Sequence, residues 1–299
     1  MTPITEVEGR RLALTNLDKV LYPSIGFTKG EALHYYATCA GALLAHLYNR
    51  PVSFLRFPDG PDGQQFFTKN VPPGTPGWVR TAEVPRHREE GTATHVLVQD
   101  MSSLVWAANL VTEFHTPQWQ ADSPGTADRM VFDLDPGAPA TVVECCTVAL
   151  WLRERLAADG LHVCAKTSGS KGLHVLVPIE PTPSEKVTAY AKELAVEAER
   201  ELPGLALHRM TRSLRPGKVF VDFSQNAAAK TTATPYTLRA RAEPTVSAPV
   251  TWEEIEGCEE PGELSFLAPE IAPRLAAYGD LLGPLINLNR ARKLPRRFR

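Results

Sequence analysis

The chain has 299 residues, of which 43% are hydrophobic and 22% are charged, and its formal net charge is −2. This composition is that of an ordinary soluble globular protein, with length enough for one large domain or two small ones. The N-terminus lacks the features of a signal peptide, and no apolar run approaches the roughly 18 residues of a membrane span. The five cysteines form no CxxC pair, which argues against a zinc site or a disulfide framework and predicts a cytoplasmic protein.

The near-neutral total hides a segregation of charge. Seven lysines and arginines but one acid lie between Arg209 and Arg241, and six bases lie in Arg290–Arg299. In contrast, Glu253–Glu270 holds seven glutamates and no base. The first basic block predicts a localised anion-binding surface. The basic end of the chain is open to another interpretation, a disordered tail.

Two helices are predicted in the N-terminal part of the chain. Thr28 and Glu31 have the spacing of a capping box, and the helix that they start runs to about Tyr48. The segment Leu104–Phe114 has helical periodicity and leads into His115, beside a turn that contains proline. His115 fits a packed, capped histidine and a site residue equally well.

Two small groups near the N-terminus are candidates for nucleic-acid contacts. Asn16, Lys19 and Lys29 lie beside a turn and the first helix start, a favourable place for a phosphate. Surface lysines without such a role explain these residues as well. Phe66 and Phe67 are adjacent and face opposite ways on a strand, so one of them is a candidate for stacking on a base. A strand buried on both sides explains the pair equally well.

An apolar strand in the middle of the chain ends in two carboxylates. Met130–Phe132 predicts a buried strand, which Pro136-Gly137 stops. Side chains alternate across a strand, so Asp133 and Asp135 share a face. At roughly 5–7 Å apart these groups repel by on the order of a few kcal/mol. The pair therefore indicates a hard divalent metal site for phosphate chemistry, with two solvated acids before a turn as the alternative.

A second apolar strand within Lys218–Asn226 carries another acid, Asp222, before a polar turn. Three strand-end carboxylates could converge on two Mg²⁺ or Mn²⁺ ions, which activate an attacking oxygen and stabilise a leaving one. The turn Thr167–Gly172 offers glycines that let amides approach an anion, serine hydroxyls and the charge of Lys171. Its spacing is not that of a P-loop.

Further polar residues complete a set suited to a triphosphate held against two metal ions. They are His174, which follows the turn, and the arginines Arg215, Arg239 and Arg241. The two arginines Arg239 and Arg241 are on one face if the segment is extended. Phosphoryl and nucleotidyl transfer require this layout, because positioning and neutralisation of charge do most of the work.

Strands and helices interleave along the second half of the chain. Helices are predicted over Thr141–Leu156 and Pro183–Leu202, and strands over His162–Lys166 and Leu173–Pro178. Because hairpins are present as well, we expect an α/β protein with a mixed sheet, not a purely parallel one.

In their joint order these motifs resemble the polymerase domain of bacterial DNA ligase D, a member of the archaeo-eukaryotic primase superfamily. The resemblance extends from about Leu14 to Trp252, nearly the whole chain. The matching stretches are Leu14–Pro23, Phe66–Phe67, His115–Trp119, Val131–Gly137, Thr167–His174, Lys218–Asn226 and Pro235–Arg241.

The resemblance implies a role for each matching residue. Asp133, Asp135 and Asp222 would bind two catalytic Mn²⁺ or Mg²⁺ ions, and the family favours Mn²⁺. The residues implied to hold the incoming nucleotide are His115, Ser168, Lys171, His174, Arg215, Gln225 and Arg239, with Arg241 in this group or supporting it. Asn16, Lys19 and Lys29 fall where the family binds the 5′-phosphate at a DNA break, and Phe66 and Phe67 where it stacks on the template strand.

The resemblance also implies a fold and a reaction. The fold would be an α+β primase-type core with a mixed β-sheet flanked by helices, and an N-terminal α/β module packed on it. We expect a single domain over residues 1–299, with the module at about 1–120, the core at about 121–250 and an acidic segment and basic tail after that. The reaction would be template-dependent addition of NTPs or dNTPs to a DNA primer at breaks or gaps, in non-homologous end joining or related repair.

Two departures from the family pattern are visible. Leu55 stands before Arg56 where some relatives have a basic residue, so one contact is expected to be missing. The chain also has no ligase or nuclease module. We therefore expect a stand-alone or split polymerase in the cytoplasm, associated with the nucleoid and with no membrane contact, with Ku and a DNA ligase acting in trans.

Three other functions are compatible with parts of the sequence. One is a primase that makes primers de novo. A second is a non-catalytic factor that binds or bridges DNA ends, against which the intact set of three acids argues. The third is a phosphatase of the haloacid dehalogenase type, whose signature is also an apolar strand followed by DxD. In that class the pair lies near the N-terminus and Thr or Val follows the second Asp, whereas here Pro136 follows.

Overall fold

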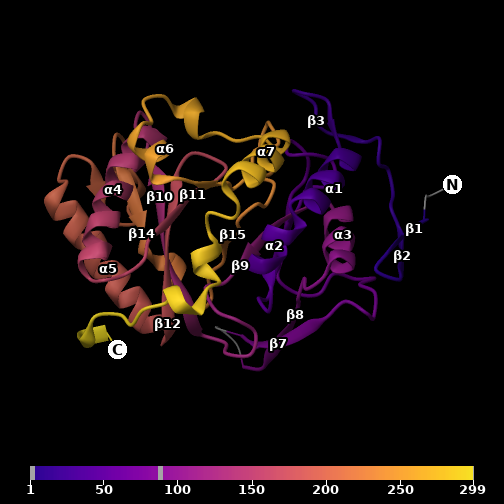
Figure 1. Cartoon of the computed structure of the whole chain (residues 1–299), viewed down its shortest axis with the longest axis horizontal. Coiled ribbons are helices and arrows are strands. Elements are labelled where there is room, and N and C mark those ends of the chain that lie inside the picture. The colour runs from indigo at the N-terminus through magenta and orange to yellow at the C-terminus, as the bar shows by residue number, and fades with distance from the viewer. Residues whose placement is uncertain (1–3, 87–89, 299) are drawn as a thin grey trace. The chain divides into compact units, whose positions relative to one another are not determined.

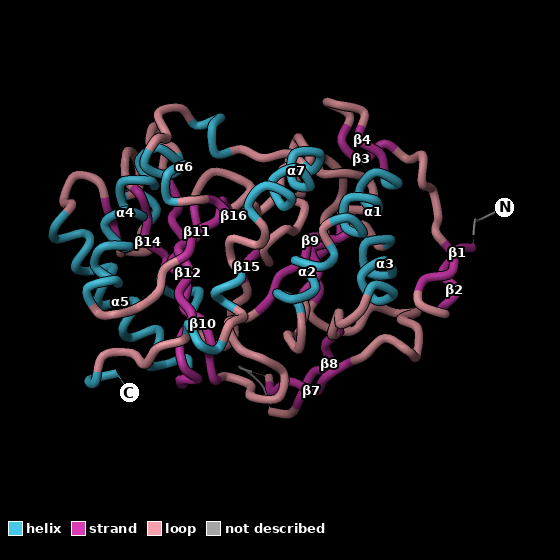
Figure 2. Tube along the Cα trace, viewed as in Figure 1, coloured by secondary structure: helices cyan, strands magenta, loops and turns pink. Residues whose placement is uncertain are grey.

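The chain alternates between two units in the computed structural model, which describes residues 4–86 and 90–298 (Figure 1). The first unit comprises Met1–Thr116, Ala233–Ser247 and Phe266–Gly279. The second comprises Pro117–Thr232, Ala248–Ser265 and Asp280–Arg299. Each unit combines strands with helices, as Figure 2 shows, and each is described below by itself.

The second unit is built on a mixed sheet with the strand order β13-β14-β10-β12-β11-β16. All neighbours are antiparallel except β13 and β14, which confirms the predicted mixed sheet. Its strands are β10 (Thr126–Pro136), β11 (Cys164–Thr167), β12 (Leu173–Pro183), β13 (Ala206–Leu207), β14 (Val219–Asp222) and β16 (Pro249–Val250). Its helices are α4 (Val142–Ala158), α5 (Ser184–Glu201) and α6 (Trp252–Glu256).

Burial explains the central strand of this sheet. Met130, Phe132 and Leu134 of β10 are fully buried on one face, and helices α4 and α5 pack against β10 and β12 (Figure 1). Val131, on the opposite face, is fully buried in a cluster with Cys164, Leu176, Leu282 and Leu285. A strand covered on both faces reads as a continuous apolar run, which is the pattern that the sequence shows. Asp133 interrupts this run at half-burial and so marks where the core ends.

The first unit contains a sheet with the order β15-β9-β5-β6 and three short hairpins, β1-β2, β3-β4 and β7-β8. Its strands are β1 (Ile4–Val7), β2 (Arg10–Ala13), β3 (Val20–Tyr22), β4 (Phe27–Thr28), β5 (Ser53–Arg56), β6 (Phe66–Thr68), β7 (Thr81–Pro85), β8 (Thr92–Val96) and β9 (Thr112–Thr116). The strand β15 (Thr232–Ala233) lies where the chain re-enters this unit. The helices are α1 (Lys29–Thr38), α2 (Ala40–Leu47), α3 (Met101–Asn109) and α7 (Ala268–Tyr278).

Two predicted helices have different limits in the structure. The capping box of Thr28 and Glu31 is present, but the helix ends at Thr38 and a second helix begins at Ala40. The second prediction, Leu104–Phe114, merged α3 with the start of β9. The chain leaves the helix at Asn109, and Val111 has a left-handed backbone (φ 56°) that turns it into the strand. His115 therefore lies on a strand and not in a loop.

The basic end of the chain is ordered against the second unit as far as Phe298. Arg292 forms a β-bridge with Ile179 of β12, and its carbonyl accepts the N–H of Glu180. The ring of Phe298 lies 5.2 Å from that of Tyr190 on α5. A disordered tail is therefore wrong for residues 290–298. In the part of the chain that the structure describes, no helix is long and apolar enough to cross a membrane.

Candidate active site

The three predicted carboxylates lie on two neighbouring strands of the second unit. Asp133 of β10 is directly opposite Asp222 at the end of β14 in the antiparallel register. Asp135 follows two residues later, on the same face as Asp133, while Leu134 is buried on the other face. The register therefore brings together the acids that the sequence predicted to converge.

Electrostatics shows how crowded these acids are. The pKa of Asp135 is raised to about 7, first because burial disfavours its charge and then because Asp133 and Asp222 repel it. The positive charges of Arg215 and Lys171 act in the opposite direction. Carboxylates that resist ionisation together are stabilised by a bound cation, and oxygen donors suit Mg²⁺ or Mn²⁺. The three carboxylates are therefore a suitable set of oxygen donors for Mg²⁺ or Mn²⁺.

The carboxylate of Asp222 is engaged by its own turn. One oxygen accepts the N–H and the hydroxyl of Ser224 at 2.9 and 2.6 Å, and the other accepts the amide of Gln225 at 2.9 Å. Gln225, predicted to hold the nucleotide, thus binds Asp222 in this structure. Within residues 4–86 and 90–298, no group of three or more His, Cys, Asp or Glu is already arranged to hold a metal ion.

Asn226 fixes this turn to the central strand, a role that the sequence did not indicate. Its side-chain amide accepts the N–H of Val131 at 2.8 Å and donates to the carbonyl of Val131 at 2.7 Å. It also donates to the carbonyl of Phe223. Because Asn226 is 1% exposed, this pairing acts as a buried extension of the sheet and holds Asp222 beside β10.

His174 lies next to the carboxylates, as predicted. It lies on β12 directly opposite Asp133 of β10, and its Nε2 lies 3.2 Å from a carboxylate oxygen of Asp133. The next residue in the same row is Lys166 of β11, which is 1% exposed and opposite His174. Lys166 was not among the predicted residues. Lys166 therefore extends the row of ionisable side chains on the face of the sheet that carries Asp133.

The serine- and glycine-rich turn packs directly on the strand of acids. The hydroxyl of Ser168 accepts the amides of Ser170 and Gly172 at 3.2 and 3.1 Å, so these two amides stabilise the turn itself. A Cβ atom on Gly172 would lie 1.8 Å from the carbonyl oxygen of Leu134, so only glycine permits this approach. The approach brings Lys171 near Asp135, whose pKa it lowers.

Arg215 reaches the acids through a second close approach. A Cβ atom on Gly137 would lie 2.2 Å from the carbonyl oxygen of Arg215, so the segment before β14 lies against the end of β10. The guanidinium of Arg215 stacks on the ring of Phe220 at 3.9 Å, and Phe220 is the register partner of Asp135. Lys171 and Arg215 therefore supply positive charge from two different loops.

His115 and Arg239 form a separate cluster within the first unit, organised by a residue that the sequence did not single out. Glu113 lies two residues before His115 on β9 and is 1% exposed. Its carboxylate binds His115 Nε2 at 2.7 Å, Arg239 Nε at 2.8 Å and the N–H of Ala240 at 2.9 Å. The pKa of Glu113 falls to about 2, because these contacts outweigh the burial that opposes its charge. The sequence could have indicated this contact, because Glu113 and His115 are two residues apart on one strand and therefore share a face.

The remaining predicted residues of this unit differ in exposure. Phe66 and Phe67 of β6, an edge strand, are 43% and 52% exposed, so a strand buried on both sides is wrong. The ring of Phe67 lies 5.8 Å from that of His115 in an edge-on arrangement. Arg239 is 9% exposed whereas Arg241 is exposed, and the N–H of Arg241 donates to the carbonyl of Arg239. This tight turn replaces the extended segment that would have placed both arginines on one face.

Asn16, Lys19 and Lys29 come together where β3 and α1 begin. The N–H of Lys19 donates to the carbonyl of Asn16, and the N–H of Lys29 donates to the carbonyl of Lys19. Asn16 is exposed and left-handed (φ 53°), whereas Lys29 is 5% exposed. The pKa of Lys29 is lowered to about 8, mainly by burial and further by the charge of Lys19.

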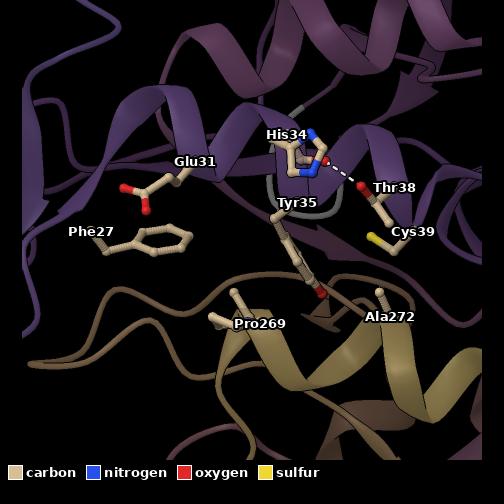
Figure 3. A pocket seen from close by; sticks show the side chains of 9 residues that line it. Phe27, Glu31, His34, Tyr35, Thr38, Cys39, Pro269 and Ala272 are labelled. Carbon is tan, nitrogen blue, oxygen red and sulfur yellow. Dashed lines mark hydrogen bonds between the residues drawn. The ribbon is translucent and has the colours of Figure 1, made fainter.

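A pocket of about 290 Å³ between α1 and α7 of the first unit is distinct from these clusters (Figure 3). Its polar groups bind the protein itself, since Tyr35 donates to the carbonyl of Tyr236 and Thr38 to that of His34. The thiol of Cys39 has a pKa raised to about 12 by burial, which disfavours a reactive thiolate. The pocket is therefore lined by apolar side chains, by the carboxylate of Glu31 and the imidazole of His34, and by a thiol of low reactivity.

The fold and the carboxylates together define an α/β protein with a site for phosphoryl or nucleotidyl transfer. A model of the family described as LigD, primase-polymerase domain, matches residues 28–282. The multifunctional non-homologous end joining protein LigD of Mycolicibacterium smegmatis is 42% identical over 279 residues, which cover 92% of this chain and 36% of that protein. The bifunctional non-homologous end joining protein LigD of Bacillus subtilis is 30% identical over 254 residues, which cover 84% of this chain and 40% of that protein.

A solved structure gives the same result. The polymerase domain from Mycobacterium tuberculosis ligase D, in complex with DNA, matches with a TM-score of 0.87 and 42% identity, over 92% of this chain and 98% of that one. The chain belongs to the LigD primase-polymerase domain family. The predicted resemblance, the fold class and the enzyme class, a nucleotidyltransferase, are thereby confirmed, and a phosphatase or a non-catalytic factor is not favoured. The chain spans about two fifths or less of the length of these curated relatives.

Proposed function

We propose that this chain extends a DNA primer at breaks or short gaps whose downstream end carries a 5′-phosphate, using NTPs or dNTPs under the direction of the template. The observation that carries the proposal is the row of acids: Asp133 opposite Asp222, with Asp135 beside them at a pKa of about 7. A site that concentrates negative charge next to Lys171 and Arg215 suits divalent metals and a triphosphate. The names of the relatives support end joining as the pathway.

Asp133, Asp135 and Asp222 would hold two Mn²⁺ or Mg²⁺ ions, with Mn²⁺ preferred. When bound, such ions activate an attacking hydroxyl and stabilise the charge of a leaving pyrophosphate. The chain's own cations neutralise the triphosphate, since Lys171 and Arg215 lie near Asp135 from two loops. Ser168 keeps the loop of Lys171 closed, and His174 orients Asp133.

Other residues would contact the nucleotide and the DNA. His115 and Arg239 are held by one carboxylate, which supports a shared role in nucleotide binding, with Arg241 exposed beside them. Phe66 and Phe67 are exposed aromatic side chains on an edge strand, suited to stacking on unpaired template bases. Asn16, Lys19 and Lys29 would bind the 5′-phosphate, because burial and the charge of Lys19 disfavour the ammonium of Lys29 and an anion would relieve this.

Primer extension on gapped, 5′-phosphorylated DNA with Mn²⁺ tests the proposal. We expect extension that depends on the template and is lost in Asp133→Ala with Asp135→Ala, while binding to 5′-phosphorylated ends is largely retained. Omitting the primer tests de novo primer synthesis, and comparing NTPs with dNTPs gives the sugar preference. Extension that survives in the doubly substituted protein would refute the metal site, and hydrolysis of a generic phosphatase substrate without extension would refute the reaction.

Partners and location follow from this pathway. Ku and a DNA ligase would act with the chain in trans, in the cytoplasm at the nucleoid. Addition of purified Ku and of a ligase to the extension assay tests whether either raises the yield of extended or joined ends.

A further inference from the structure

Lys19 is held by a turn that is distant in the sequence. Its ammonium donates to the carboxylate of Asp59 at 2.5 Å and to the carbonyl of Pro58 at 2.7 Å. An ammonium has three N–H donors, so two of them point into this turn. The side chains of Lys19 and Asp59 are 37% and 67% exposed, so the pair is accessible to a ligand from solvent.

The backbone presents Asp59 to Lys19. Gly60, the next residue, is left-handed (φ +86°), and a Cβ atom on it would lie 2.5 Å from the carbonyl oxygen of Leu21. Its N–H donates to the carbonyl of Phe57 at 2.9 Å. The turn therefore packs on β3, the strand that begins directly after Lys19. The carboxylate is consequently held near the ammonium by close backbone packing.

A second lysine, Lys29, interacts electrostatically with Lys19. The side chain of Lys29 is 5% exposed, and its ammonium donates to the hydroxyl of Thr15 at 3.2 Å. The charge of Lys19 adds to burial in disfavouring the ammonium of Lys29. An anion that binds between Lys19 and Lys29 relieves this repulsion, so the two lysines favour anion binding. The carboxylate of Asp59 is such an anion, supplied by the chain itself.

We propose that Asp59 is an internal competitor for the 5′-phosphate at Lys19 and thereby sets the affinity and selectivity of the site. The inference rests on the proposed function, in which Lys19 and Lys29 bind that phosphate. A terminal phosphate carries about −1.5 to −2 charges at pH 7 and has three strong acceptor oxygens. Because of this higher charge the terminal phosphate displaces the singly charged carboxylate from Lys19, whereas a 5′-hydroxyl end has no terminal phosphate and leaves the pair of Lys19 and Asp59 in place.

Substitution of Asp59 by asparagine tests the competition. The affinity of Asp59→Asn for a gapped duplex with a 5′-phosphate should rise about two- to fivefold, the range expected for an exposed ion pair. Its affinity for the same duplex with a 5′-hydroxyl should not change, and fluorescence anisotropy at low ionic strength measures both. Asp62→Asn is the matched control, since it removes the same charge from an exposed position in the same turn and should change neither affinity. Unchanged binding of the phosphorylated duplex by Asp59→Asn, or equal tightening of both duplexes, would overturn the proposal.

Lys19→Ala separates this inference from the function on which it rests. In the Lys19→Ala background, Asp59→Asn should have no further effect on the phosphorylated duplex, because the group for which it competes is gone. Lys19→Ala that leaves the preference for the 5′-phosphate intact would refute the phosphate site itself. A preference that depends on Lys19 but not on Asp59 would refute the competitor alone. Thermal unfolding of each variant establishes that the fold is retained.

Discussion

Replacing Glu113 by glutamine tests whether one buried carboxylate holds His115 and Arg239. The substitution keeps the shape of the side chain but removes the carboxylate that pairs with the guanidinium of Arg239 in a buried site. Breaking such a pair from one side costs about 3–5 kcal/mol. The shift of the Glu113 pKa from 4.5 to about 2 corresponds to a similar value, roughly 3 kcal/mol. We therefore expect Glu113→Gln to lower the melting temperature by about 5–10 °C.

Kinetics distinguish loss of position from loss of fold. At a temperature where Glu113→Gln remains folded, we expect the KM for the nucleotide to rise about tenfold with a smaller change in kcat, since His115 and Arg239 are proposed to bind the substrate. Glu83→Gln is the matched control, because Glu83 lies exposed on strand β7 and bonds two threonine hydroxyls of the neighbouring strand. Its melting temperature and KM should stay close to those of the original chain.

The contribution of Glu113 to the free energy of unfolding also depends on pH. The folded-state pKa of Glu113 lies below its unfolded value, so its contribution to stability is complete above about pH 4.5 and is lost as the pH falls towards about 2. The free energy of unfolding should therefore fall more steeply below about pH 4.5 in the original chain than in Glu113→Gln. Parallel curves, together with an unchanged KM, would refute the role of Glu113.

Three further predictions concern the other clusters. In EDTA at about pH 8, Asp135→Asn should raise the free energy of unfolding by about 1–2 kcal/mol, a value reduced for the partial exposure of the side chain. The folded-state pKa of Asp135, about 7, lies above the unfolded 3.8, so this gain should shrink as the pH falls from 7 towards 4, and urea unfolding at several pH values measures it. Gly172→Ala should destabilise the protein and abolish primer extension, because its Cβ would meet the carbonyl of Leu134; retained activity would contradict this contact. Phe66→Ala with Phe67→Ala should weaken binding to a single-stranded template overhang about tenfold or more without changing the melting temperature, and an unchanged Kd would contradict stacking.

The sequence predicted the central strand and its acids because both depend on local patterns. Burial on two faces produces a continuous apolar run, and alternation assigns Asp133 and Asp135 to one face. The capping box of Thr28 and Glu31 is local as well and is present as predicted. The limits of helices were less predictable, since the left-handed backbone of Val111 interrupts an apolar pattern that is continuous in the sequence.

The contacts between clusters of charge could not be read from the sequence. Whether Asp133 faces Asp222 or its neighbour depends on the register of two strands, and a shift by one residue would turn a side chain to the other face. In the sequence, Gly137 and Gly172 look like ordinary turn residues. Only the structure shows that the lack of a side chain at each lets a loop pack closely against β10. Asn226, likewise, is only a polar residue after a strand until its amide is found paired with Val131.

The two lysines proposed to bind a phosphate show why residue identity alone does not set affinity. Lys19 and Lys29 were candidates because of their place beside a helix start, and a count of charges would treat them as equivalent. In the structure Lys29 is buried against Thr15, whereas Lys19 shares its ammonium with Asp59. The first arrangement raises the free energy of the unliganded site and so favours an anion, and the second lowers that free energy and so opposes one. The net affinity for a 5′-phosphate therefore depends on an acid in a turn that no phosphate motif includes.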